Sequence, residues 1–79
     1  MNRETLIKMI EEALGFDPTL IKDDTNFRED LGADSLNAIE LVCCIEEETG
    51  IDILDKEIDG LNTLSDVINL LKLKKVWEE

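Results

Sequence analysis

Residues 27–50 read FREDLGADSLNAIELVCCIEEETG and contain the clearest helix signal in the chain. Asp34 stands where a helix N-cap belongs, because its carboxylate can accept backbone N–H groups and lies at the positive end of the helix dipole. Gly50 is suited to end the helix, since glycine readily adopts the left-handed conformation. We therefore predict a helix over residues 35–49.

This helix carries two apolar strips where a small bundle needs one. At about 100° per residue, the strip suited to the core comprises Ala38, Leu41, Val42, Ile45 and Thr49. The strip on the opposite side comprises Leu36, Ile39 and Cys43. Glu40 and Glu47 flank this second strip, and Glu46 lies near its other edge. An apolar strip fringed with carboxylates indicates a docking surface. The alternative is that the long loop or the short helix covers it.

The other segments are also predicted to be mostly helical. Apolar spacing favours helices over residues 3–14 and 63–74, and a short helix over residues 55–60. Thr63 followed by Asp66 resembles a capping box. No stretch has a sustained strand pattern. We therefore predict an all-α fold, a small antiparallel bundle of three long helices and one short helix.

Residues 15–34 are predicted to form a long loop, because turn formers replace the helical period there. Residues 18–21 are expected to add a short helical turn. The apolar residues expected to pin the loop onto the helices are Phe16, Leu20, Ile21, Phe27 and Leu31. Residues 75–79 form a tail that contains Trp77. Since 79 residues suffice for one small core, we interpret residues 1–79 as a single domain.

The chain is strongly acidic, with 8 basic and 20 acidic residues, no histidine and a net charge of −12. Residues 29–59 hold eleven of the acids and a single base, Lys56. Such charge disfavours nucleic acid and anionic membranes as partners and favours proteins with basic patches. No apolar run suits a membrane span or a signal peptide, so we expect a cytoplasmic protein that does not insert into membranes.

No metal site is predicted. Cys43 and Cys44 are adjacent and would point about 100° apart on a helix, which disfavours a disulfide between them. Two thiols without histidine make a poor zinc site. The aspartates at 23–24 and 52–59 lack the ligand spacing of an EF-hand loop.

Ser35 is one of only two serines and begins the 35–49 helix. Its hydroxyl is expected at a positive helix end, which favours a phosphate group. A nucleophilic serine needs a general base, and the chain has no histidine and no lysine near Ser35 in sequence. A modified serine and an ordinary first helical residue remain, and position alone favours the second.

Residues 27–50 closely resemble the acyl carrier proteins of fatty acid and polyketide synthesis. The match consists of Leu31-Gly32-Ala33-Asp34-Ser35-Leu36, then Ile39-Glu40-Leu41-Val42 and Glu46-Glu47-Glu48, and the resemblance extends over about residues 3–73. It implies that Ser35, beside Asp34, carries 4′-phosphopantetheine, which a separate phosphopantetheinyl transferase takes from coenzyme A. The chain would then be a monomeric, non-catalytic carrier that hands acyl thioesters between acyl-transfer and synthase enzymes.

The resemblance also bears on partners and pathway. The residues that match partner-contacting positions of the family are Leu36, Ile39, Glu40, Cys43 and Glu47, and Glu46 completes the predicted surface. Fatty acid biosynthesis is the leading expectation. The alternatives are a specialised polyketide, aminoacyl or cell-wall acylation carrier, and an unmodified acidic adaptor. Leu54 stands where many relatives have proline, and Cys43 where a larger apolar residue is common. Small side chains such as Ala38, Cys44 and Ile68 are expected to leave a cleft for the acyl chain.

Overall fold

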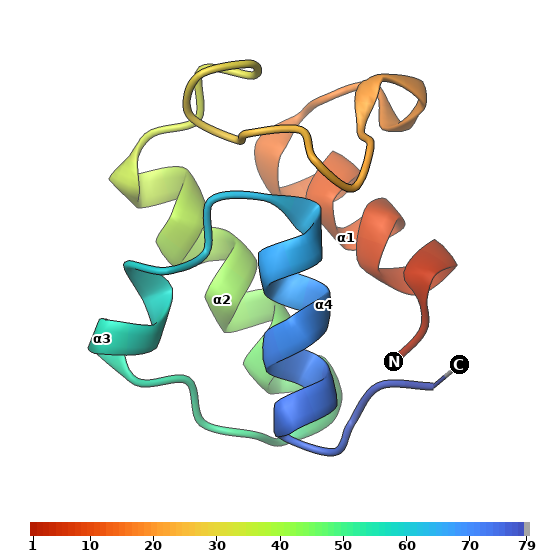
Figure 1. Cartoon of the computed structure of the whole chain (residues 1–79), viewed down its shortest axis with the longest axis vertical. Coiled ribbons are helices and arrows are strands. Elements are labelled where there is room, and N and C mark those ends of the chain that lie inside the picture. The colour runs from red at the N-terminus through yellow and green to blue at the C-terminus, as the bar shows by residue number, and fades with distance from the viewer. Residues whose placement is uncertain (79) are drawn as a thin grey trace.

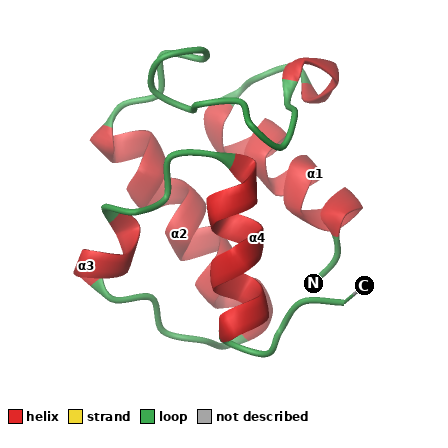
Figure 2. Cartoon of the chain, in the orientation of Figure 1, coloured by secondary structure: helices red, strands yellow, loops and turns green. Residues whose placement is uncertain are grey.

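The computed structural model describes residues 1–78, which form a helical bundle (Figures 1 and 2). Its elements, in chain order, are α1 (Arg3–Leu14), the single 3₁₀ turn η1 (Pro18–Leu20), α2 (Ser35–Thr49), α3 (Asp55–Ile58) and α4 (Leu64–Leu73). Helix α1 runs antiparallel to α2 and α4 (Figure 1). Residues 1–78 contain no strand beyond one isolated bridge between Asn26 and Thr63. The predicted all-α fold class is confirmed.

The core lies where the three long helices meet. Each contributes residues spaced three or four apart, which keeps them on one side of the helix. The most deeply buried side chains are Leu6, Ile10, Ile45, Leu64, Val67 and Leu71. On α2, Leu41, Val42 and Ile45 are buried, so the core strip of this helix faces inward as its spacing predicts. The opposite side of α2 is therefore not part of the core.

Three helix ends differ from the sequence prediction for local reasons. Helix α4 ends at Leu73, one residue before the predicted end, and beyond it Lys75 N–H donates to Lys72 O over 3.1 Å, a bond that spans three residues. Helix α4 begins at Leu64 because Thr63 is its extended N-cap, accepting a hydrogen bond from Asp66 N while Asp66 accepts one from Thr63 N. Helix α3 ends at Ile58, two residues before the predicted end. Beyond it, Gly60 N–H donates to Glu57 O and Leu61 N–H donates to Ile58 O. These bonds span three residues, so the chain tightens into turns and the α-helix stops.

The long loop crosses one end of the bundle and is anchored at several points (Figure 1). Ile21 and Phe27 are buried in the core, and Phe27 N–H donates to Asn62 O over 2.8 Å. Phe16 and Leu31 pack against the core from partly buried positions. Leu20 is 61% exposed, so its expected role as an anchor is wrong. It ends η1, whose tight turn directs Leu20 outward and Ile21 inward.

Helix α3 has only four residues and is held by side chains. Glu57 accepts hydrogen bonds from Leu54 N and from Lys74 Nζ, each at 2.9 Å. These donors, the Leu54 N–H first, hold the pKa of Glu57 below its ordinary value because they favour the ionised carboxylate. Glu46 of α2 accepts a hydrogen bond from Ile53 N over 2.9 Å. Carboxylates therefore tie α3 and the segment before it to α2 and α4.

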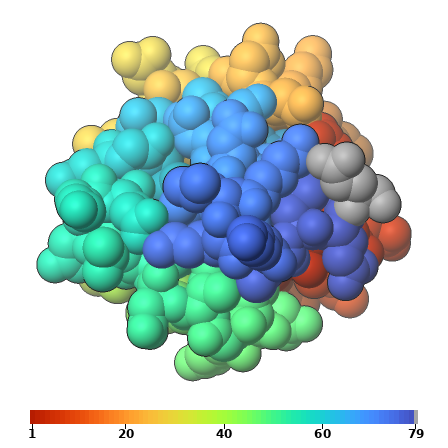
Figure 3. Space-filling view, turned by 60° about the horizontal axis from the view of Figure 1, so that its bottom comes forward, coloured from red at the N-terminus to blue at the C-terminus, as the bar shows by residue number. Residues whose placement is uncertain are grey.

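The tail lies against the beginning of the chain. Val76 and Trp77 pack on the core, and Glu78 N–H donates to Met1 O over 2.7 Å. Figure 3 shows the two ends adjacent on one face. Residue 79, the last of the predicted tail, lies outside the described residues. Within residues 1–78, none of the helices combines the length and the apolar content that crossing a membrane requires.

Candidate functional site

Ser35 is the first residue of α2, and its side chain is exposed. Asp34 precedes it as an extended N-cap and accepts a hydrogen bond from Asn37 N over 2.9 Å. Asn37 Oδ1 in turn accepts one from Asp34 N over 3.1 Å. This reciprocal cap fixes the first turn of α2 and leaves the Ser35 hydroxyl at the positive end of the helix dipole.

A tight turn delivers the chain to this helix start. Gly32 has φ +71°, a left-handed conformation that strains residues with a Cβ. Its N–H donates to Arg28 O over 3.1 Å, and the next residue, Ala33, is buried and donates from its N–H to Phe27 O over 2.8 Å. Ala33 thus anchors the turn just before Asp34 and Ser35 return to the surface.

Ser35 lies in a surface groove between α2 and α3. The groove measures about 280 Å³ and is lined by Arg28, Ser35, Ala38, Ile39, Asp55, Ile58 and Asp59. Its apolar residues come from both helices, and its charged residues come from α3, from the residue that follows it and from the long loop. Four of these residues, Arg28, Asp55, Ile58 and Asp59, are not predicted from the sequence as site residues. They reach Ser35 only through the packing of separate segments.

The second apolar strip of α2 is at the surface. Leu36 is 65% exposed and Ile39 is 49% exposed, and Cys43 is exposed as well. Glu40 and Glu47 are exposed beside them. Neither the long loop nor α3 fully covers the strip, contrary to the alternative considered from the sequence. We call Leu36, Ile39, Glu40, Cys43 and Glu47 the α2 face.

Three residues near the α2 face have surroundings that the sequence did not predict. Glu46 is half-buried and holds Ile53 N, so its carboxylate has a structural partner. Leu54, the N-cap of α3, is 52% exposed. Its departure from the proline common at this position is the only sequence signal that pointed to it. Cys44 is half-buried, and burial, with Glu47 as a further cause, raises the pKa of its thiol.

The cavity found beside Ala38 differs in its lining from the cleft that the sequence predicted among Ala38, Cys44 and Ile68. A small cavity of about 20 Å³ lies beneath the start of α2 and is lined by Leu14, Phe27, Arg28, Ala33, Asp34, Ala38, Leu41, Val42 and Leu61. Of the three expected residues, only Ala38 lines it. This volume holds about one water molecule. An acyl chain would therefore enter only if the surrounding helices moved apart.

The family comparison agrees with this geometry. Residues 4–71 match the family model described as "Phosphopantetheine attachment site". Acyl carrier proteins of Rickettsia canadensis and Rickettsia typhi are each 46% identical over 69 residues, which is 87% of this chain and 80% of theirs. A solved structure from Mycobacterium tuberculosis, described as an acyl carrier protein, superposes with a TM-score of 0.81 at 27% identity and covers 90% of this chain and 95% of its own.

The fold and the matched model define a phosphopantetheine attachment domain. The chain belongs to the acyl carrier protein family, and its prosthetic group is 4′-phosphopantetheine. The residues present fit such a group. An exposed hydroxyl is available for a phosphodiester, the helix dipole favours the phosphate charge, and an open groove leads away from the hydroxyl.

Proposed function

We propose that Ser35 is the attachment residue for 4′-phosphopantetheine and that the chain carries acyl intermediates of fatty acid biosynthesis as a non-catalytic carrier. The observation that supports this most directly is the exposed Ser35 hydroxyl at the capped start of α2. Ser65, the other serine, is half-buried in the first turn of α4 and is tied through its N–H to Asp23 O. Ser35 is therefore the more accessible serine to a modifying enzyme.

This proposal assigns separate roles to the residues of the site, the prosthetic group and the partner enzymes. Asp34 and Asn37 hold the backbone of the first turn of α2, so the Ser35 side chain is held at the helix start. When bound, 4′-phosphopantetheine supplies a thiol that holds acyl groups as thioesters. The chain lacks histidine, the usual general base for a serine nucleophile, so catalysis is left to partner enzymes. A phosphopantetheinyl transferase would attach the group, and acyl-transfer and synthase enzymes would use it.

The choice of fatty acid biosynthesis is tested by acylation of the holo-protein. We expect malonyl transferase and fatty acyl synthetase to load it, and enzymes that activate amino acids to leave it unloaded. Ala33 after Gly32, and Leu36 after Ser35, favour this outcome over an aminoacyl carrier. Intact mass reports each product directly. Preferential aminoacylation would contradict the fatty acid assignment and support a specialised carrier. Two exposed residues that differ from the residues common in the family, Cys43 and Leu54, are consistent with that alternative.

We further propose that the α2 face docks partner enzymes through their basic patches. Leu36 and Ile39 supply apolar contact area, and Glu40 and Glu47 steer a positively charged partner. Because both glutamates are exposed, their attraction extends about 8 Å at physiological ionic strength and weakens as salt rises. Partner encounters would therefore be fast and salt-sensitive. We expect the carrier itself to be a cytoplasmic monomer.

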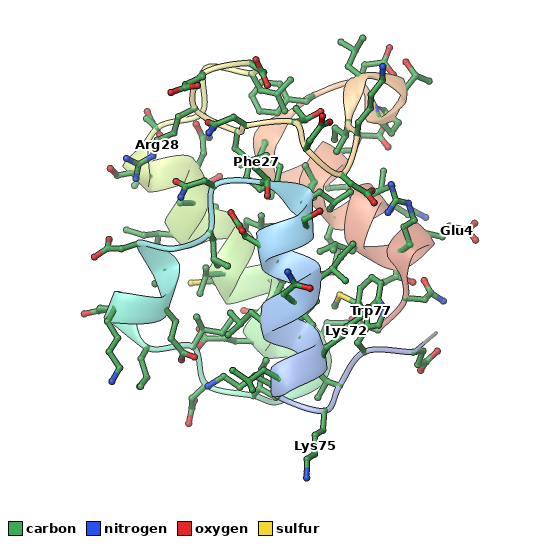
Figure 4. All side chains as sticks on the ribbon, in the orientation of Figure 1. Glu4, Phe27, Arg28, Lys72, Lys75 and Trp77 are labelled. Atoms are coloured by element: carbon green, nitrogen blue, oxygen red, sulfur yellow. The ribbon has the colours of Figure 1, made fainter. Side chains whose placement is uncertain are left out.

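Charge reversal tests the docking role. Glu40→Lys and Glu47→Lys are each expected to lower kcat/KM of a partner enzyme roughly tenfold at low salt, and less at high salt, because steering is lost. Glu4→Lys makes the same charge change on α1, on the far side of the molecule from the start of α2, and should alter turnover little (Figure 4). Circular dichroism should show unchanged helicity in all three. Equal turnover by all variants at low salt would show that partners dock elsewhere.

A further inference from the structure

Arg28 is the one cation among the residues that line the groove beside Ser35. Figure 4 shows its side chain next to the start of α2. Within residues 1–78, its guanidinium has no ion pair with a carboxylate, although Asp55 and Asp59 line the same groove. By contrast, Arg3 is paired with Asp23 and Lys74 with Glu57. The guanidinium of Arg28 is thus available to another anion.

The backbone that carries Arg28 is firmly placed. Arg28 N–H donates to Asn26 Oδ1 over 2.9 Å, and Gly32 N–H donates to Arg28 O over 3.1 Å. Phe27, the preceding residue, is buried and bound through its N–H to Asn62 O. These contacts hold the base of the Arg28 side chain against the same turn that leads into α2. Little backbone freedom is then lost when the guanidinium binds a ligand.

A phosphodiester on Ser35 would bring a permanent negative charge into an acidic groove. Asp34 precedes Ser35, and Asp55 and Asp59 stand across the groove, so three carboxylates would repel this charge unless a cation lay close. Arginine suits the task, since its planar guanidinium donates two parallel hydrogen bonds to phosphate oxygens and stays charged at every physiological pH.

We propose that Arg28 binds the phosphate of the group on Ser35 and directs the arm along the groove between α2 and α3. This inference rests on the proposed attachment at Ser35. Ile39 belongs both to the groove and to the α2 face. An arm that leaves Ser35 by this route would therefore pass toward the surface on which partners dock. Arg28 would bind and orient the arm and take no part in the acyl-transfer chemistry.

Nuclear magnetic resonance of the full-length apo- and holo-protein tests the proposal. On loading, the Arg28 Nε–H resonance is expected to shift and its exchange with water to slow. The ³¹P line of the holo-protein is expected to be broader in the wild type than in Arg28→Gln, because the bound phosphate moves less freely. Arg28→Lys should fall between them, since lysine keeps the charge and loses the paired hydrogen bonds. Lys22→Gln removes an exposed charge elsewhere on the long loop and should match the wild type.

The outcomes separate this inference from the attachment itself. Suppose that the wild type gains the mass of one phosphopantetheine, that its Arg28 Nε–H resonance is the same in the apo- and holo-protein, and that the ³¹P line of Arg28→Gln is as broad as that of the wild type. The arm is then attached and Arg28 does not bind it. If the wild type gains no such mass, the attachment fails and the role of Arg28 fails with it. The wild-type resonance provides this test even if Arg28→Gln folds poorly.

Discussion

Ser35→Ala is expected to abolish loading completely while the helical fold persists. In the proposed attachment the phosphodiester forms on the Ser35 oxygen, so the variant should accept no label from fluorescent coenzyme A and a phosphopantetheinyl transferase. The fold should tolerate the change because the Ser35 side chain is exposed and the cap of α2 is provided by Asp34 and Asn37. Alanine is also the best helix former. Intact mass and circular dichroism measure the two effects separately.

Ser65→Ala is the matched control, since the chain contains only these two serines. Its contact with Asp23 is made through the backbone N–H and survives the substitution, so loading should equal that of the wild type. Labelling of Ser35→Ala would refute the attachment site. An unmodified protein recovered from native cells that contain the transferase would instead favour the acidic adaptor considered from the sequence.

Leu71→Ala is expected to cause a large loss of stability. Leu71 of α4 is fully buried, and removing a buried leucine side chain costs about 2–5 kcal/mol. A 79-residue domain has a total unfolding free energy of about 4–12 kcal/mol, so the variant would lose much of its stability or unfold. Urea titration followed by the fluorescence of Trp77, the only tryptophan, measures the change.

Leu73→Ala provides the comparison within the same helix. Leu73 lies two residues further along α4 and is 74% exposed, so its truncation should change stability by no more than about 0.5 kcal/mol. Similar losses in both variants would mean that the assignment of the buried side of α4 is wrong. A large difference would show that this helix is stabilised mainly through one face.

The helices and their starts follow from residues that are close in sequence. Asp34 and the Thr63–Asp66 pair are recognisable as caps from residue types within one helical turn. The part that Asn37 takes in the cap of α2 is added by the structure. The apolar period of α2 likewise separates Leu41 and Ile45, which are buried, from Leu36 and Ile39, which are exposed. Such interactions depend on the geometry of one helix, which is the same in every fold.

The residues that line the groove beside Ser35 could not be predicted from local sequence patterns. Arg28 comes from the long loop, while Asp55 and Asp59 lie at the two ends of α3, and nothing in their local sequence places them next to Ser35. The same holds for Glu46, whose helical position suggested a partner contact but whose carboxylate binds Ile53 N. Leu20 and Ile21 are adjacent apolar residues of the loop, yet only Ile21 is buried.

Those placements arise from contacts between segments far apart in the chain. The loop follows the path on which Phe27 fills the core and its N–H reaches Asn62 O, and this path carries Arg28 to the start of α2. Residue spacing therefore accounts for which faces of the helices are apolar and where the helices begin. The neighbours of Ser35 depend on how the long loop and α3 pack against α2, because burial and hydrogen bonding are satisfied there by the whole chain together.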